Sequence, residues 1–502
     1  MTEENLPNDI KSLKTIIIQQ YQTIQQLNET LQKLQAQMEW FQRYFFGSKS
    51  ERGSKIQVGD PMPAKTTAKV KPNAASSTTK ANGRRKLPEH LPREIIELDL
   101  SESKKRCSCG RTLHHLGYDI SEQLEFIPAK LYVKQYKRYK YGCRGCAASV
   151  VSAELPPSPI EKGLAGPGLL TELIVSKYAD ALPLYRQEKR WERLGYVIPR
   201  TTQCDWMSAC AELLRPLYEY MKTQVLQSNK IHTDDTVMPV LAPDKTHKGR
   251  LWVYIGGDHQ TPDCTVFEYT KTRSQTGPQR FLEHYRGFLQ ADAYSGYDKL
   301  YATKKIIEVA CFAHARRKFV DVVEYYQTKT SAERILVLIQ QLYAIETQVR
   351  HMSIDARYYM RRHHAKPILK KLYRFMKLCK KTALPNSLLD KALNYSINHW
   401  QALCNYLRSG DLEIDNNRAE RAMRLVVLGR KNYLFAGSHA GAEWAAIFYS
   451  LIYTCQQHQV NVSAYFKDIL SRLPSATIQQ LPEFLPYHWV KYRPPQSITD
   501  SS

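Results

Sequence analysis

The chain has 502 residues, and its 72 lysines and arginines against 48 aspartates and glutamates give a formal net charge of +24. This surplus favours a polyanionic partner, nucleic acid above all. There is no apolar run of about eighteen residues, which excludes a membrane-spanning segment, and the polar start excludes a secretory signal. Eleven cysteines, an odd number, argue against a disulfide scaffold. We expect a multidomain cytoplasmic protein without a membrane partner.

Residues 8–47 carry a seven-residue repeat of apolar side chains. Isoleucine dominates the first position of the repeat and leucine the position three residues later. This a/d pattern predicts a coiled coil, and isoleucine at a with leucine at d favours a parallel homodimer. The polar Gln20 at one d position could set the register of other oligomers. The alternative is an amphipathic helix packed on the protein's own body.

Residues 48–92 are rich in Lys, Pro, Ala, Ser and Thr, and predict a basic, flexible linker that cannot bury a core. Residues 93–152 then hold two close cysteine pairs on either side of a strand-like stretch, 131–141. Pairs at the ends of short strands can place four ligands tetrahedrally, which suits structural Zn²⁺. The expected ligands are Cys107, Cys109, Cys143 and Cys146. The first pair is one residue shorter than usual, so His114 or His115 could replace a thiolate, and isolated buried cysteines are the alternative.

Residues 160–226 have helical periodicity, with a turn at Gly195 between two predicted helices. Helix, glycine turn and second helix in this order resemble a helix-turn-helix, which predicts a DNA-binding region. The pattern is common, and plain helical packing is the alternative.

Residues 227–455 alternate between strand and helix signals and predict an α/β core. The predicted strands are 231–238, 251–255, 265–270, 287–292 and 306–312, with helices at 278–285 and 295–303. Three strands joined by loops predict an antiparallel meander. The whole order is that of a ribonuclease H-like fold, in which acids on the first and fourth strands lie side by side. We expect a lysine-rich helical insertion at about 325–405 and a C-terminal segment at 456–502.

Three acids fit this core: Asp234 on the first strand, Asp292 at the end of the fourth, and Glu420 on a later helix. Carboxylates gathered in this way hold two divalent ions, which activate a nucleophilic oxygen and stabilise a leaving oxygen in phosphoryl transfer. Mg²⁺ prefers such hard ligands. The alternative for Glu420 is structural, because it could cap its helix with Asn417 or pair with Arg424.

Several motifs carry a family resemblance. They lie at 45–51, 176–187, 232–236, 291–297, 312–319, 415–421, 429–438 and 481–487, together with the cysteine pairs. With these motifs the chain resembles DDE-type transposases of insertion sequence family 66 from about residue 10 to residue 493. The most specific motif is Asp-Asn-Asn-Arg-Ala-Glu-Arg at 415–421. The family usually has Glu after the first catalytic Asp, whereas this chain has Asp235.

The resemblance implies a bacterial, nucleoid-associated enzyme that cleaves the ends of a mobile element and joins them to target DNA. It implies Asp234, Asp292 and Glu420 as the catalytic triad with Mg²⁺ or Mn²⁺, structural Zn²⁺ at the four cysteines, double-stranded DNA as partner, and accessory proteins from the same element. Beside the acids we expect DNA contacts from His314, Arg316, Arg317, Arg430 and Lys431. The alternative for these side chains is a solvated helix surface.

Two other functions compete with a transposase. One is a catalytically inactive DNA-binding regulator derived from a transposase, against which the three intact acid motifs argue. The other is a nuclease of RNA or of Holliday junctions on the same fold, which leaves the coiled coil and the zinc module unexplained.

Overall fold

The computed structural model describes residues 130–141, 151–152, 154–243, 245–327 and 331–492. The predicted coiled coil, the predicted linker and the four cysteines of the predicted zinc module lie outside these residues.

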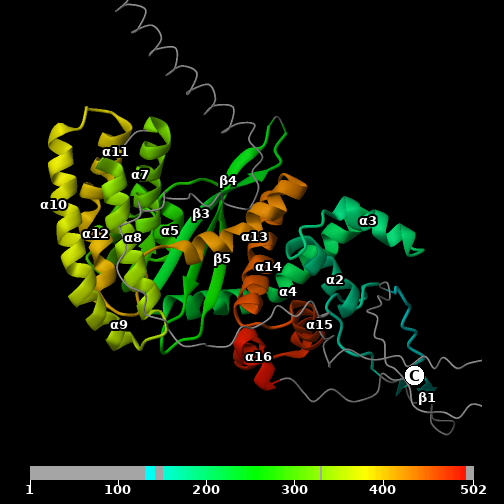
Figure 1. Cartoon of the computed structure of the whole chain (residues 1–502). Helices are drawn as coiled ribbons and strands as arrows, with labels where there is room; N and C mark the ends of the chain where they lie inside the picture. The colour runs from blue at the N-terminus through cyan, green and yellow to red at the C-terminus, as the bar shows by residue number, and fades with distance from the viewer. Residues whose placement is uncertain (1–129, 142–150, 153, 244, 328–330, 493–502) are drawn as a thin grey trace, which may run out of the picture. The chain divides into compact units, whose positions relative to one another are not determined.

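A mixed five-stranded sheet organises these residues (Figure 1). Its strands are β3 (Lys230–Val240), β4 (His247–Gly256), β5 (Cys264–Thr270), β6 (Gly287–Ala291) and β7 (Ile306–Ala310). They lie in the order β5-β4-β3-β6-β7. The first three strands in sequence pair antiparallel, whereas β3 with β6 and β6 with β7 pair parallel. The predicted antiparallel meander is confirmed, as is the predicted pairing of the first strand with the fourth.

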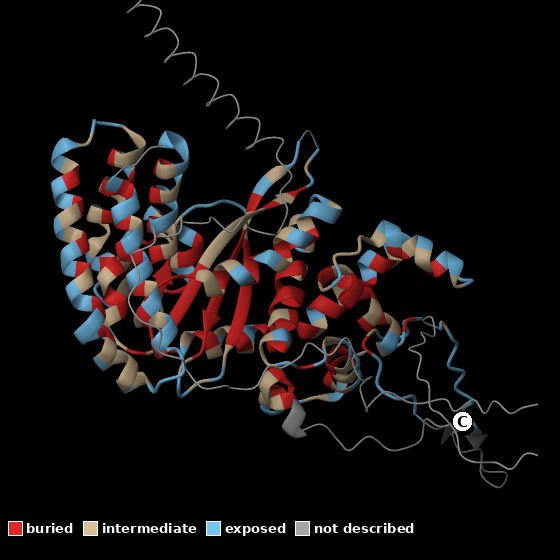
Figure 2. Ribbon diagram, in the orientation of Figure 1, coloured by how far each residue is buried: buried red, intermediate tan, exposed pale blue. Residues whose placement is uncertain are grey.

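Helices cover both faces of the sheet. On β5, the ring of Phe267 lies 5.9 Å from that of Tyr449 in α14 (His439–Gln457). On β4, Tyr254 stacks at 3.8 Å on Phe281 of α5 (Thr276–Phe281). Residues 251–255 of β4 are fully buried, which is typical of a strand covered on both faces (Figure 2). None of the described helices combines the length and apolar composition needed to cross a bilayer.

The free edge of β5 is closed by side chains of α14. The Ser450 hydroxyl accepts a hydrogen bond from the backbone N–H of Phe267 at 2.8 Å, and the Thr454 hydroxyl accepts one from Thr265 at 3.2 Å. An unpaired strand edge is a template for association with other chains. These two hydroxyls satisfy the edge without a sixth strand.

The helices before the sheet share its hydrophobic core. They are α2 (Pro167–Tyr178), α3 (Leu184–Arg193) and α4 (Arg200–Leu226), and the predicted turn at Gly195 has a φ of +90°. The long α4 packs against β4, β5 and α14, and α2 packs against α15 (Val462–Arg472). One cluster of buried side chains runs from α2 through the sheet to α15. Helices were predicted here correctly, but the core is continuous across residue 226.

Between β7 and α13 (Asn417–Tyr433) the chain builds a second, helical core. Its helices are α7 (Phe312–Tyr326), α8 (Ser331–Val349), α9 (Ile354–Met360), α10 (Lys366–Thr382), α11 (Leu388–Asn398) and α12 (Trp400–Cys404). Figure 1 shows them as a bundle beside the β7 edge of the sheet, and α12 packs against β7. The predicted helical insertion is this bundle.

Several predicted strand limits differ from the structure: β3 and β4 are longer than predicted, and β6 ends one residue before Asp292. Of the stretch 131–141, only Lys140–Tyr141 forms a strand (β1), paired with Val151–Ser152 (β2). Tyr136 and Tyr139 are exposed, and within the described residues the stretch before β1 has no partner strand, so alternation alone did not produce a ladder. Phe312 begins α7 instead of ending β7, because its backbone N–H bonds to the carbonyl of Ile414.

Candidate active site

Two acids follow the parallel pairing of β3 and β6, with Asp234 inside β3 and Asp292 one residue after the end of β6. His232 pairs with Gln290, so Asp234 and Asp292, each two residues further on, occupy matching positions. Asp292 is close enough to raise the pKa of Asp234, and the charged neighbours of Asp292 itself include His314, Asp235 and Arg273.

A buried asparagine fixes the start of α13 against these strands. The Asn416 side chain lies fully buried; its Nδ2 donates to the carbonyl of Thr233 at 2.8 Å, and its Oδ1 lies 3.1 Å from Nδ1 of His232. The Asn416 backbone N–H donates to Sγ of Cys311 at 3.1 Å. Burial lowers the pKa of His232 to about 3, so this imidazole is neutral and donates from Nδ1.

A second clamp holds the segment just before Asn416. The Gln290 amide donates to the carbonyls of Glu413 at 2.5 Å and Asp415 at 2.8 Å, and its oxygen accepts from the Glu413 backbone N–H. Because Gln290 lies on β6, the clamp ties the α13 start directly to the strand that ends at Asp292. Glu420 lies in the first turn of α13 and is carried to the strand ends by these contacts.

The three acids interact electrostatically. The pKa of Asp234 is raised to about 7, first by burial and then by the negative charges of Asp292, Asp235 and Glu420, against one lowering hydrogen bond from the Asp235 backbone N–H. The pKa of Asp292 is also raised, mainly by burial, although nearby His314 and Arg273 oppose that rise. Raised carboxyl pKa values of this origin indicate buried negative charge that lacks sufficient compensation.

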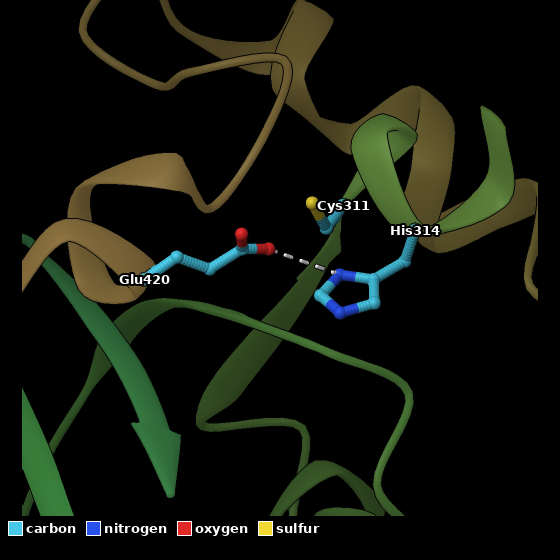
Figure 3. Close-up of side chains that lie close together, drawn as sticks. All are labelled: Cys311, His314 and Glu420. Carbon is cyan, nitrogen blue, oxygen red and sulfur yellow. Dashed lines mark ion pairs between the residues drawn. The ribbon is translucent and has the colours of Figure 1, made fainter. Parts of the chain in front are cut away.

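Glu420 faces the start of α7. Its Oε1 lies 3.8 Å from Nδ1 of His314, and its Oε2 lies 3.8 Å from Arg317. Figure 3 shows its carboxylate directed at His314, with Cys311 beside them; one ligand atom from each of the three lies within 4.8 Å of the others. Oε1 is buried without a hydrogen-bond partner. Glu420 makes no capping hydrogen bond at its own helix, so the capping alternative is wrong.

Asp235 has a different environment from Asp234. It lies opposite Trp252 on β4, whereas Asp234 lies opposite Val253, so the two carboxylates point to opposite faces. Arg250 and Arg273 each donate to Asp235 at 2.9 Å, and its side chain is only 3% exposed. Two guanidinium groups thus neutralise Asp235 within the fold.

The donor set formed by Asp234, Asp292 and Glu420 fits hard divalent cations. Asp234 has no lysine or arginine partner among the described residues, and Glu420 has an orphaned buried oxygen. Carboxylate oxygens are the ligands that Mg²⁺ and Mn²⁺ take in phosphoryl-transfer sites. We therefore regard Asp234, Asp292 and Glu420 as side chains able to hold divalent metal.

Four sequence profiles match the chain. "Transposase IS66 family" matches residues 162–444, "zinc-finger binding domain of transposase IS66" 104–147, "Transposase C of IS166 homeodomain" 33–96 and "IS66 C-terminal element" 450–487. The first match covers more than half of the chain. The chain belongs to the IS66 transposase family. The predicted resemblance is confirmed.

Proteins of Sinorhizobium fredii (strain NBRC 101917 / NGR234) are similar over nearly the full length. "Uncharacterized protein y4jD" is 31% identical over 495 residues, which cover 93% of this chain and 96% of that protein. "Uncharacterized protein y4hP" is 28% identical over 491 residues, 91% of this chain and 88% of that protein. The similarity therefore includes the N-terminal modules as well as the sheet.

For this IS66 transposase, the predicted DNA contacts fall into two groups. Arg316 and Lys431 are exposed, and Arg317 is 59% exposed although it lies near Glu420. His314 is half-buried against Glu420, and Arg430 donates to the Thr236 hydroxyl at 3.0 Å and to a β3 carbonyl. The Arg430 side chain thus supports β3. A DNA role for these five side chains stays a prediction.

The zinc-finger profile spans all four predicted zinc ligands, Cys107, Cys109, Cys143 and Cys146, and it supports structural zinc. Their geometry lies outside the described residues. The pairing of these particular thiols with Zn²⁺ therefore stays a prediction.

Several residues that shape the site were not predicted as site residues. Arg273 neutralises Asp235 and lies near Asp292, and Asn416, His232 and Gln290 position Glu420. The sequence could have identified two of them, because His232 and Asn416 lie inside the motifs that carry the family resemblance. Arg273 lies outside those motifs and could be found only from the fold.

Proposed function

We propose that this IS66 transposase is an active, divalent metal-dependent enzyme that cleaves and joins DNA strands with Asp234, Asp292 and Glu420. The observation that carries the proposal is the electrostatic coupling of three carboxylates from β3, the end of β6 and α13, with no cation bonded to Asp234 within the described residues. Such a set is poised to hold metal where a scissile phosphate must bind.

We further propose that the catalytic sheet is ribonuclease H-like. Support comes from the strand order β5-β4-β3-β6-β7, with three antiparallel strands followed by two parallel ones. In that fold the acids on the first and fourth strands are neighbours; here β3, which carries Asp234, pairs with β6, which Asp292 follows directly, and this supports the proposal.

The chemistry divides between the bound ions and the protein. When bound, divalent ions activate the attacking oxygen and stabilise the leaving oxygen. Asp234, Asp292 and Glu420 would hold the ions, while Asn416 and Gln290 keep the carboxylates in position. In the first reaction water attacks the phosphorus at the element end, the bond to the 3′ oxygen breaks, the attacking water loses a proton to solvent, and the leaving 3′ oxygen takes one up to become a hydroxyl. In the second, the freed 3′-OH loses its proton as it attacks a target phosphorus, and the displaced target 3′ oxygen takes up a proton.

Arg317 and His314 lie close to the negatively charged carboxylate of Glu420. They lie 3.8 Å from its two oxygens. The Arg317 guanidinium would also be able to bind a phosphate of the DNA, because of its planar set of donors. The exposed Arg316 and Lys431 extend this basic rim.

The other modules complete the proposal. Zn²⁺ bound by Cys107, Cys109, Cys143 and Cys146 would order a DNA-binding module near the N-terminus. The heptads at 8–47 would join copies of the chain, so that two element ends are held together. The helices α3 and α4 would contribute DNA contacts at their exposed turn, where Tyr196 and Val197 are half exposed.

The test is a strand-cleavage and strand-transfer assay on a duplex that carries the inverted repeats flanking the encoding DNA. We expect nicks with Mg²⁺ and none when Ca²⁺ replaces it, and we expect Asp234→Asn, Asp292→Asn and Glu420→Gln each to remove both reactions. Asp298→Asn is the matched control, because Asp298 is an exposed acid on α6 (Asp298–Ala302) outside the site. DNA binding without any cleavage by the unmodified chain would favour the inactive regulator instead.

A further inference from the structure

The helix α10 in the inserted bundle has an unusual charge composition. Its 17 residues, KPILKKLYRFMKLCKKT, include six lysines and one arginine and no acid. Within the described residues only Lys380 has an ion-pair partner, Asp390. A solvated helix face normally mixes both signs of charge, so this helix concentrates uncompensated positive charge.

These cations form one stripe. Lys366, Lys370, Arg374, Lys377 and Lys381 are exposed and follow one another at spacings of four, four, three and four residues. At 100° per residue they fall within an arc of about 80°, and at 1.5 Å per residue they span about 22 Å. The stripe therefore runs along the whole helix on a single side.

A groove adds to the stripe from the neighbouring helix. It has a volume of about 440 Å³, and its lining residues are Arg334, Pro367, Lys370, Lys371, Arg374, Phe375 and Leu378. Arg334 comes from α8, and its guanidinium lies 4.7 Å from the centre of the Phe375 ring. Four cations thus line one open depression. The helix α10 itself lies on the side of the bundle that faces away from the sheet (Figure 1).

The bundle holds this surface in a fixed position. A π-helical turn, η4 (Arg361–Ala365), joins α9 to α10, and its Arg361 is fully buried. Arg361 donates to both oxygens of Glu346 at 2.8 and 2.6 Å and to the carbonyl of Ser409 at 2.9 Å. Because α10 begins where η4 ends, these bonds anchor the basic stripe before any ligand arrives.

We propose that the stripe and groove on α10 bind the phosphate backbone of duplex DNA at a second place, outside the active site. The inference rests on the proposed function only in taking DNA as the substrate. A row of cations about 22 Å long is long enough to lie along several successive phosphates of one strand. Arg334, Lys370 and Arg374 would contact phosphate oxygens, and the contacts would be independent of base sequence.

A membrane surface fits this helix less well. Membrane-surface helices insert an apolar face opposite their lysines. On α10 that face consists of Leu369, Leu372, Met376 and Cys379, and all four are buried against the bundle. The charges can therefore meet a polyanion, but the helix has no free apolar face to insert.

The experiment measures the affinity of the full chain for a 5′-labelled duplex by fluorescence anisotropy at several salt concentrations, without added Mg²⁺. The stripe variant is Lys370→Gln/Arg374→Gln/Lys377→Gln. The control, Lys299→Gln/Lys305→Gln/Lys467→Gln, removes the same charge from exposed lysines elsewhere. Each lost phosphate contact reduces the salt slope by about 0.9, so we expect the stripe variant to lose roughly 2.7 and the control to keep the original slope.

Two further measurements keep the test decisive. Circular dichroism checks folding, and Lys370→Arg/Lys377→Arg, which keeps the charge, should restore the original slope. Equal slopes for the stripe variant and the control would overturn the proposal, as would a loss of binding to phosphatidylserine vesicles with an unchanged DNA slope. Absence of DNA binding by the unmodified chain would instead contradict the proposed function.

Discussion

Two neighbouring carboxylates of β3, Asp235 and Asp234, have opposite electrostatic environments. On one face Asp235 is 3% exposed and receives hydrogen bonds from Arg250 and Arg273 at 2.9 Å. On the other, Asp234 is bonded within the described residues to one backbone N–H, and its pKa is raised to about 7 by burial and by the other acids. Burial of a charge is tolerated when a partner neutralises it.

The comparison separates a structural acid from a functional one. The fold itself supplies the countercharge of Asp235, so that carboxylate helps to hold β3, β4 and the loop of Arg273 together. Among the described residues no lysine or arginine is bonded to Asp234, and its raised pKa disfavours the charged form. A proton or a bound cation would relieve this cost in stability, and the two residues should therefore respond oppositely to substitution.

The largest expected effect is the loss of chemistry at Asp234. Asp234→Asn should lower the cleavage rate at least ~1000-fold, since metal contributes several kcal/mol to the reaction and about 1.4 kcal/mol is tenfold in rate. The free energy of unfolding without Mg²⁺ should stay the same or rise, because a buried negative charge is removed. Rates come from single-turnover cleavage and stability from urea unfolding. Retained cleavage would exclude Asp234 from the site.

The next effect concerns His232, which lies on the Asp234 face and holds Asn416. Its pKa is lowered to about 3 by burial, so below its ordinary value the folded chain binds fewer protons than the unfolded chain. The free energy of unfolding is therefore undiminished above pH 6.5. It falls as the pH drops from 6.5 toward 3, because the unfolded chain takes up a proton at His232, and the loss is about 2–3 kcal/mol at pH 4.5.

Asp234 contributes a pH dependence of the opposite sign. Because its pKa is raised, its contribution to the free energy of unfolding falls as the pH rises from 3.8 to 7. The comparison with His232→Gln cancels that contribution, since both proteins contain Asp234. Urea unfolding at pH 4.5 to 7.5 should show the stability advantage of the unmodified chain over His232→Gln shrinking on acidification. A constant difference across this range would show that His232 is not neutral when buried.

A smaller loss is expected at the paired acid. Asp235→Ala leaves Arg250 and Arg273 without their carboxylate and should reduce the free energy of unfolding by about 1–3 kcal/mol. The arginines are 23% and 42% exposed, so water moderates the loss. Cleavage should fall far less than in Asp234→Asn. Removing Arg273 in the same chain should recover part of the stability, and strict additivity of the two changes would argue against the pair.

The smallest expected effect is the stabilisation of the folded chain by bound Mg²⁺. At a Mg²⁺ concentration ten times its dissociation constant, binding should stabilise the chain by about 1.4 kcal/mol, a shift of roughly 2 °C in Tm. The shift should vanish in Asp234→Asn and persist in Asp235→Asn. Calorimetric melts with and without Mg²⁺ measure it, and a similar shift in both variants would place the ion elsewhere.

Local patterns in the sequence determined much of this protein. A period of two residues located the strands and put Asp234 and Asp235 on opposite faces, and the end of a strand signal located Asp292. The strand limits near 131–141 failed because alternation marks a possible strand but not its partner.

Only the tertiary structure decided which distant groups meet. Glu420 reaches the strand acids across the whole inserted bundle because Asn416 bonds to His232 and Thr233, and Arg430 turns to β3 because that strand offers it a hydroxyl and a carbonyl. Arg273 lies in the loop after β5 and donates a hydrogen bond to Asp235 on β3. The physical reason is range: side-chain periodicity acts over a few residues, whereas these hydrogen bonds and ion pairs depend on how segments separated by tens to hundreds of residues pack together.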